Sequence, residues 1–286
     1  MGKWMHDIDR RWLYLLLFLA VALPMLFPSK GGSAVILPET QSFYDTVERV
    51  AADPKRRDKL VLLVANFSAS TATENLNQYE SAMRHVMRHR LKFAIVSFAD
   101  PQGRELGQQT ADKLASQFGY QYGRDYVNWG FKTGDIALNV KALARDIPGT
   151  IGKDIKGTPL GQIPVMQGVR GVDDIGLVVE TASADTLEYW LAYFRAAGDE
   201  PVPLLFSCTA VMAVEAYPFL RSGQIQGMLN GLKGAGEYET LLQSPGFATQ
   251  VSPSLSWAHF VILFLIALGN LSLFLSRRRA GSRGGA

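Results

Sequence analysis

The sequence is almost without cysteine. Its 286 residues include a single one, Cys208, which can form no disulfide within the chain, so the small disulfide-stapled folds are excluded. Cys208 lies in an apolar stretch, and we expect its thiol to be buried. With 48% hydrophobic residues, a chain of this length can bury a full core, which also excludes a disordered or collagen-like chain.

Positive charge is scarce outside the two chain ends. Residues 1–11 and 277–286 together carry +5, whereas the formal net charge of the whole chain is +3, which leaves −2 for the residues between them. A body with this balance has no basic surface on which to gather phosphates, and we predict that it does not bind nucleic acid.

Several motifs that carry chemistry are also missing. The chain has no Gly-x-Gly-x-x-Gly after its first expected strand, no Walker A lysine and no Gly-x-Ser-x-Gly. His85 and His89 are four residues apart, but arginines surround them and no zincin glutamate follows, so we interpret them as part of a solvated helix face. We therefore predict no cofactor and no metal, and we assign no catalytic residue.

Two long apolar runs lie near the ends of the chain. Residues 12–28 and 257–276 are predicted to be transmembrane helices, and the 19 residues from Trp257 to Leu275 would span about 28 Å. Basic residues precede the first run and follow the second, which predicts that both termini are cytoplasmic. A cleaved signal peptide is the alternative for the first run, because Ala20-Val21-Ala22 has the form of a cleavage site.

These spans define the predicted domain organisation. The expected order is a cytoplasmic tail, a transmembrane helix, a linker, an extracytoplasmic α/β domain, a second linker, a second transmembrane helix and a basic cytoplasmic tail. The expected bounds are residues 1–11, 12–28, 29–34, 35–244, 245–256, 257–276 and 277–286. The lipid bilayer is then an obligatory partner, and the predicted location is the cytoplasmic (inner) membrane of a bacterium.

The region between the spans alternates apolar runs with helical patterns. Strands are expected at residues 60–65, 93–98, 175–179 and 202–206, with a weaker one at 125–129, and helices at 73–90, 104–118, 135–146 and 186–197. Because the strands are apolar without alternation, they are expected to be buried on both faces and to pair in parallel. This pattern predicts an open, mostly parallel, doubly wound sheet of about five strands, of the flavodoxin-like kind.

Polar residues follow the expected strands. In an open α/β sheet, ligands bind beyond the carboxyl ends of the strands, so these residues form a candidate ligand site. Every α/β protein has polar loops there, and ordinary helix caps are the alternative interpretation. The candidate ligand residues are Asn66, Ser68, Asp100, Lys132, Asp135, Glu180, Thr181 and Cys208.

Two glycine-rich segments stand apart from this alternation. Residues 148–171 are expected to form a long loop over an edge of the sheet. Gly223, Gly227 and Gly231 are four residues apart and would form one stripe of a helix at residues 222–242. Such a stripe allows close packing, either within the domain or against a partner, and we take these glycines as candidate interface residues.

The two spans, the α/β body and the segment from Ser222 to Glu239 resemble bacterial two-span membrane proteins with an extracytoplasmic α/β domain. That resemblance implies a topology and no activity. The architecture is also similar to the auxiliary membrane components of gliding-type ABC export systems. We expect a non-enzymatic structural, sensing or assembly subunit with a membrane-protein partner or a second copy of the chain. A tethered hydrolase or a small-ligand receptor that uses the strand-end residues is the alternative.

Overall fold

The computed structural model describes residues 9–26 and 35–283. The chain divides into two compact units, which are Ala34–Ala248 on the one hand and the two chain ends, Met1–Ser33 with Thr249–Ala286, on the other. The predicted linker at residues 29–34, and all but the last three residues of the predicted N-terminal tail, lie outside the described residues.

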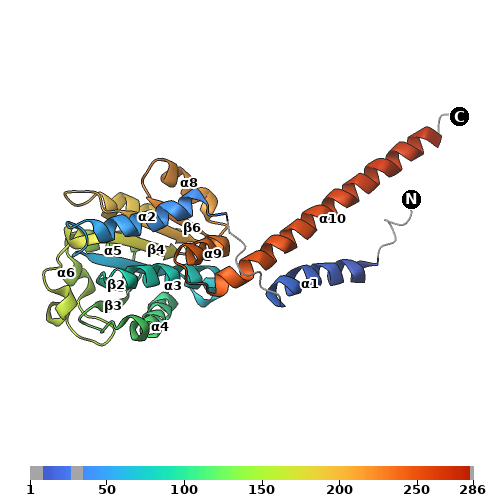
Figure 1. The fold of residues 1–286 in the computed structure, drawn as a ribbon. Helices are drawn as coiled ribbons and strands as arrows, with labels where there is room; N and C mark the ends of the chain where they lie inside the picture. The colour runs from blue at the N-terminus through green and yellow to red at the C-terminus, as the bar shows by residue number, and fades with distance from the viewer. Residues whose placement is uncertain (1–8, 27–34, 284–286) are drawn as a thin grey trace. The chain divides into compact units, whose positions relative to one another are not determined.

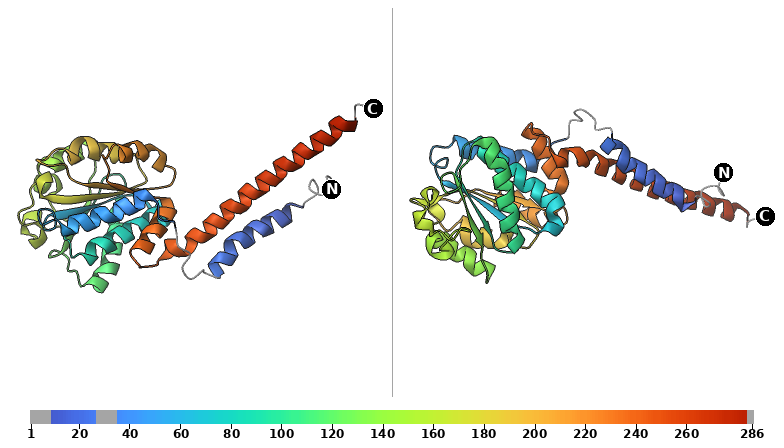
Figure 2. Two further views of the ribbon diagram at one scale, coloured as in Figure 1. Left: turned by 45° about the horizontal axis from the view of Figure 1, so that its top comes forward. Right: turned by 90° about the horizontal axis from the view of Figure 1, so that it is seen from below.

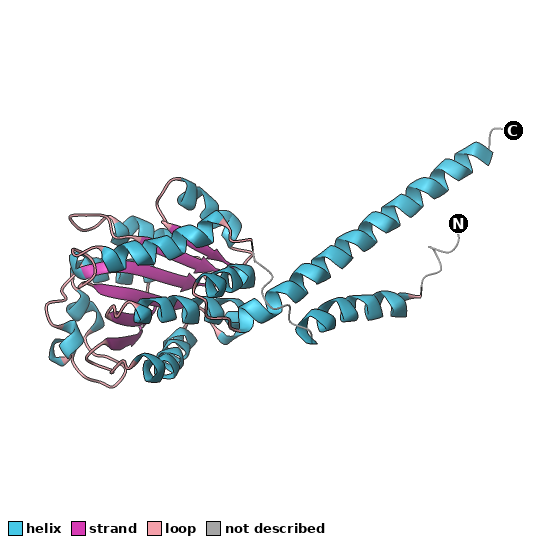
Figure 3. Ribbon diagram, viewed as in Figure 1, coloured by secondary structure: helices cyan, strands magenta, loops and turns pink. Residues whose placement is uncertain are grey.

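The unit Ala34–Ala248 is an α/β domain built on one parallel sheet (Figures 1 and 3). All five expected strands are present, and a sixth that the sequence did not predict follows them. The strands are β1 (Leu60–Asn66), β2 (Phe93–Ser97), β3 (Tyr126–Phe131), β4 (Ile175–Ala182), β5 (Leu204–Cys208) and β6 (Gly227–Asn230). β1 to β5 are buried along almost their whole length, as their unbroken apolar sequences predict.

The strand order corrects the expected topology. The six strands lie in the order β3-β2-β1-β4-β5-β6, which is that of the doubly wound dinucleotide-binding folds rather than the flavodoxin-like order. The chain builds outward from β1 to the edge strand β3 and then returns to β4, beside β1. The point where the order reverses therefore lies between β1 and β4.

Helices cover both faces of the sheet (Figure 2). One face packs against α2 (Pro38–Ala52), α3 (Ala72–Arg88), α4 (Pro101–Phe118) and α9 (Gly231–Leu241). The other packs against α5 (Ile136–Arg145), α6 (Ile147–Ile151), α7 (Leu187–Trp190), the π-helical turn Leu191–Arg195 and α8 (Ala213–Arg221). Side chains alternate along β1. Val61 and Leu63 point to the face covered by α2, α3, α4 and α9, and Leu62 and Val64 point to the opposite face.

The segment at residues 148–171 is more ordered than the expected long loop. It contains most of α6 and the 3₁₀ turns Leu160–Gln162 and Pro164–Met166. Its apolar side chains, Ile163 and Val165 among them, are buried in the same core as those of α5 and α7. Residues 164–169 line a cavity beside Leu60 and Lys92, at the amino ends of β1 and β2. The backbone N–H of Ile155 donates to the carbonyl of Asn128 in the edge strand β3 at 3.0 Å, so the segment does lie at an edge of the sheet.

The second unit consists of helical chain ends. They are α1 (Arg10–Leu26) and α10 (Phe247–Arg283), whose first two residues belong to the α/β unit. Among the described helices, only the part Phe247–Leu271 of α10 is long and apolar enough to cross a membrane, and α1 is shorter. Most of the predicted linker at residues 245–256 is helical, because α10 begins at Phe247 and continues through Pro253, which removes only one helical hydrogen bond.

Candidate functional site

The expected ligand site lies at the point where the strand order reverses. Asn66 ends β1, and Thr181 and Ala182 end the neighbouring strand β4, with Ala182 directly opposite Asn66. The turn that follows β1 reads Asn-Phe-Ser-Ala-Ser-Thr and forms a 3₁₀ turn with no glycine, so the strand order alone indicates no phosphate-binding loop.

A buried group of side chains closes this position. Asn66 Nδ2 donates to Glu180 Oε1 at 3.0 Å, and the Thr186 hydroxyl donates to the same oxygen. Asn66 Oδ1 accepts from the backbone N–H of Phe98 at 2.9 Å and of Ala99 at 3.2 Å. Asn66 and Glu180 have no exposed surface, and Thr186 is almost fully buried. The predicted residues Asn66 and Glu180 do meet, but they join β1, β4 and the loop after β2 instead of facing solvent.

The carboxyl group of Glu180 is unusual in its environment. It lies between Val64 of β1 and Phe206 of β5, on the face that packs against α7. Burial raises the pKa of Glu180 to about 7, although the hydrogen bonds from Thr186 and Asn66 pull it down. Below about pH 7 this carboxyl group is mostly protonated, and it forms a structural part of the core.

A second buried group was missed by the sequence analysis. Gln78 of α3 donates its Nε2 hydrogens to the carbonyls of Cys208, Leu229 and Gly231, at 2.9, 3.1 and 2.9 Å. Asn75, one turn earlier, donates to the Ala182 carbonyl at 3.3 Å. The available signal was two amides three residues apart on the apolar face of a predicted helix. Together they fasten α3 to the carboxyl ends of β4, β5 and β6.

The remaining predicted residues serve local structure. Asp100 and Asp135 accept from the backbone N–H of Gln102 and Leu138, at 2.8 and 2.9 Å, and so cap α4 and α5. Lys132 Nζ donates to the Ile151 carbonyl at 2.9 Å, and the hydroxyls of Ser68 and Ser70 are 2.6 Å apart. Lys132 and Asp135 follow the edge strand β3, with β2 and β1 between it and β4, so they do not converge with Glu180.

Thr181 and Cys208 are fully buried. The expectation of a buried thiol is confirmed, and burial, with the nearby carboxylates of Glu74 and Glu180, raises the pKa of Cys208 to about 12. Such a thiol stays protonated and is a poor nucleophile. A small cavity of about 160 Å³ lies at the carboxyl ends of the strands, between the β4–α7 loop and α8, and is lined in part by Asp185, Glu188 and Glu215. None of the eight predicted ligand residues lines it.

The predicted helical stripe of Gly223, Gly227 and Gly231 is wrong. Gly227 begins β6, Gly231 begins α9 with φ +58°, and Gly223 occupies a turn with φ +72°, so the three share no helix face. A Cβ at Gly227 would lie 2.3 Å from the backbone nitrogen of Phe43 in α2. The absence of a side chain there serves packing within the domain.

The packing of α2 on α3 adds a carboxylate to the two histidines that the sequence had shown as a pair. Glu48 Oε1 of α2 lies 2.9 Å from Nε2 of His85, on α3, and 3.0 Å from Nε2 of His89, the residue directly after α3. The three candidate ligand atoms all lie within 4.8 Å of one another. The interpretation of a solvated helix face is wrong for His85, which is only 1% exposed, because α2 and α9 pack over that side of α3.

The surroundings of His85 fix its ring. Its Nδ1 lies 2.6 Å from the hydroxyl of Tyr238 in α9, and Tyr44 stacks on the imidazole with ring centroids 4.6 Å apart. Burial lowers the pKa of His85 to about 4, so the imidazole is neutral at physiological pH. Burial alone would raise the pKa of Glu48, but hydrogen bonds to His85 and His89 outweigh it and the pKa is below its ordinary value.

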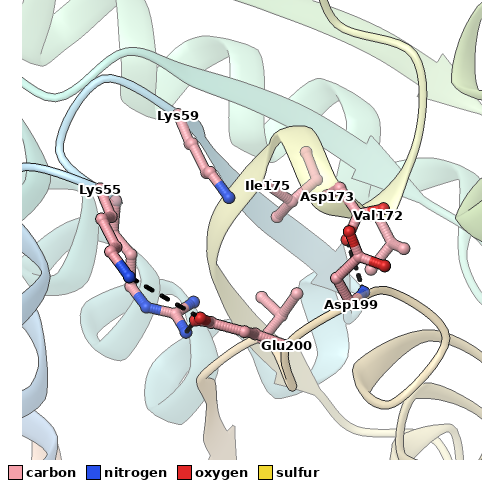
Figure 4. A pocket seen from close by; sticks show the side chains of 9 residues that line it. Lys55, Lys59, Val172, Asp173, Ile175, Asp199 and Glu200 are labelled. Carbon is pink, nitrogen blue, oxygen red and sulfur yellow. Dashed lines mark hydrogen bonds and ion pairs between the residues drawn. The ribbon is translucent and has the colours of Figure 1, made fainter.

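A charged cavity of about 380 Å³ lies at the amino ends of the strands (Figure 4). Glu200 lies 3.2 Å from Arg56 and 4.0 Å from Lys55, and Asp173 accepts from the backbone N–H of Asp199 at 2.9 Å. Lys59 extends into the space between these groups (Figure 4). Both signs of charge line the cavity, and Glu200 is already paired with Arg56 and Lys55. The cavity lies at the amino ends of β1 and β4, away from the usual ligand position.

Comparison of the chain with protein-family models, with curated proteins and with solved structures finds no match.

Proposed function

We propose that this chain is a membrane-anchored α/β domain that acts as a non-catalytic subunit of a membrane complex, with its α/β unit on the extracytoplasmic side. One observation carries the proposal. Both ends of the α/β unit are attached to the same helix, α9, and from there the chain leads toward apolar helices.

Two buried glutamates of α9 make these attachments. Glu237 Oε2 accepts from the backbone N–H of Leu37, just before α2, at 3.0 Å. Glu239 Oε2 accepts from the N–H of Gly246, just before α10, at 2.9 Å, and its Oε1 accepts from that of Ala248 at 3.4 Å. The chain thus enters and leaves the α/β unit at neighbouring points, as a body held by two anchors in one membrane requires.

The apolar helices support the membrane assignment. At 1.5 Å per residue, the 25 residues Phe247–Leu271 extend over about 38 Å, more than the hydrocarbon core of about 30 Å. Almost none of this stretch is buried within the protein, so its apolar side chains need another apolar environment. Basic residues 277–279 follow the apolar stretch of α10, and Arg10 and Arg11 begin α1, which favours cytoplasmic termini.

The closed carboxyl edge favours a subunit over a catalyst. Asn66, Glu180, Thr181 and Cys208, which a hydrolase or receptor would present to its ligand, are fully buried. The more exposed Asp100 and Asp135 cap helices. Opening this edge to a ligand would break the hydrogen bonds that join β1 to β4, which argues against the alternative function.

Cysteine accessibility tests the topology, and the chain suits it because its single thiol is buried. The wild type should stay unlabelled by a membrane-impermeant maleimide. Gln109→Cys, on the exposed side of α4, should label in right-side-out membrane vesicles, and Ser282→Cys only in inverted ones. The reverse pattern, or recovery of the chain in the soluble fraction after carbonate extraction, would contradict the proposal.

The subunit role is tested by purifying the full chain from its own host in a mild detergent and identifying what accompanies it by mass spectrometry. We expect a stoichiometric membrane-protein partner or a defined homo-oligomer. A chain lacking residues 35–248 is the control and should lose that partner. Recovery of the monomer alone in several detergents would argue against a subunit.

A further inference from the structure

The Glu48, His85 and His89 cluster is independent of the membrane assignment and of the closed carboxyl edge. It joins two imidazole nitrogens from one turn of α3 with a carboxylate oxygen from α2. We propose that these three residues bind a divalent transition-metal ion of the Zn²⁺ class.

The distances suit a metal ion with little rearrangement. Zn²⁺ bonds to histidine nitrogen and carboxylate oxygen are about 2.0–2.2 Å long, so tetrahedral ligands lie about 3.3 Å from each other. Glu48 Oε1 is 2.9 Å from His85 Nε2 and 3.0 Å from His89 Nε2. The two distances to Glu48 need to lengthen by a few tenths of an ångström. The histidine nitrogens already lie within 4.8 Å of each other, and rotation of the partly exposed His89 can adjust that third side.

The donor set selects the class of metal. Two imidazoles and one carboxylate suit Zn²⁺, Co²⁺, Ni²⁺ or Fe²⁺, whereas Mg²⁺ and Ca²⁺ prefer oxygen ligands. Arg88 contributes a positive charge near His85, which further disfavours an ion held mainly by charge. Three protein ligands leave at least one coordination position for water or another ligand.

Both access and orientation are present. The side chains of Glu48 and His89 are 40% and 31% exposed, so an ion can enter from solvent, while His85 forms the buried wall. Histidines that bind metals almost always use their second ring nitrogen in a hydrogen bond. Here His85 Nδ1 can donate to the Tyr238 hydroxyl at 2.6 Å, which leaves the Nε2 lone pair free for the metal.

Without an ion, hydrogen bonds pair the polar side-chain atoms of the cluster with one another and with Tyr238. Tyr238 can then donate to His85 Nδ1, and both Nε2–H groups can donate to Glu48. Metal binding replaces the two hydrogen bonds to Glu48 by coordination. It also exchanges the donor and acceptor roles of His85 Nδ1 and the Tyr238 hydroxyl. The site is therefore preorganised, and its affinity reflects the difference between two satisfied states.

The test uses the full chain in detergent, produced without a histidine tag, stripped with EDTA and titrated with Co²⁺ while visible absorption is recorded. We expect one Co²⁺ per chain, displaced by Zn²⁺. His89→Ala and Glu48→Gln, both at partly exposed positions, should abolish stoichiometric binding. The control is the double variant His6→Ala, His259→Ala, which removes the two other histidines and should bind like the wild type.

A second measurement does not depend on how the variants fold. Zinc-edge X-ray absorption of the wild type loaded with one Zn²⁺ per chain should show two imidazole ligands and one or more oxygens. Tyr238→Phe, which removes the partner of Nδ1, should weaken binding by about 10- to 100-fold. Absence of stoichiometric Co²⁺ binding, equal binding by His89→Ala, or a zinc spectrum without imidazole would each overturn the proposal.

Discussion

Replacing Glu180 by glutamine should remove a pH dependence of stability that the wild type owes to one buried carboxyl group. Glutamine has nearly the same shape, and its Oε1 can still accept from Asn66 and Thr186. It has no proton to lose between pH 4 and 8. The comparison therefore isolates the ionisation of this single side chain.

The sign of the effect follows from proton linkage. Burial raises the pKa of Glu180 from 4.5 to about 7 in the folded protein. Between these values the folded state keeps the proton that the unfolded state has lost, so the free energy of unfolding falls as the pH rises. The contribution is fully present below pH 4.5 and is lost by about pH 7.

The size of the shift sets the magnitude. Each pKa unit corresponds to about 1.4 kcal/mol. The free energy of unfolding of the wild type should therefore fall by about 3 kcal/mol between pH 4.5 and pH 7 because of Glu180. For a domain of this size, about 1 kcal/mol moves Tm by roughly 2–4 °C. The Tm of Glu180→Gln minus that of the wild type should therefore increase by roughly 6–12 °C from pH 4.5 to pH 7.

The assay is thermal unfolding of both proteins in the same detergent with EDTA, followed by near-UV circular dichroism, to which the buried Trp129 and Trp190 contribute. Only the difference between the proteins is informative. The lowered pKa of His85 gives stability that is lost as the pH falls through about 6.5 to 4, which opposes the trend from Glu180. Parallel Tm profiles for the two proteins would refute the reasoning.

Three further predictions concern packing and accessibility. Gly227→Ala should destabilise the domain by about 3 kcal/mol or more in thermal unfolding, because its methyl group meets the backbone of Phe43, whereas Gly161→Ala, with open space around it, should stay within about 0.5 kcal/mol. Glu239→Gln weakens a charge-assisted bond to the start of α10, and amide hydrogen exchange there should accelerate about tenfold, corresponding to about 1.4 kcal/mol. Cys208 should react with maleimide only as fast as the domain unfolds, so labelling above the global unfolding rate would contradict its burial.

The sheet was largely predictable because burial on both faces leaves a direct mark on sequence. The five strands found from the sequence are apolar runs within a covered parallel sheet. β6 was missed because it has four residues, and the glycines around it repeat at helical spacing. What fixes Gly227 is the approach of Phe43, from a helix about 180 residues earlier in the chain. No local pattern contains that information.

The candidate sites show the same division. The sequence placed Asn66 and Glu180 at strand ends, since that follows from the strand assignments, but the expected strand order did not make β1 and β4 neighbours. It could not show that their polar groups bond to each other. The His85 and His89 pair was visible as well, but Glu48 lies in a helix that was not predicted, although Phe43, Val47 and Val50 carry its apolar spacing. Ligands from separate helices can be joined only when the packing of those helices is known.

Three consecutive residues of α9 connect the features that matter most here. Glu237 holds the entry of the chain, Tyr238 contacts His85, and Glu239 holds the exit toward α10. Since Glu237 and Glu239 are buried acceptors of backbone N–H groups, moving α9 would disturb both connections together. A metal ion bound to His85 would fix the Tyr238 hydroxyl through Nδ1, and with it the helix that carries both attachments. The proposed metal site and the proposed anchoring would thus act on the same short segment of backbone.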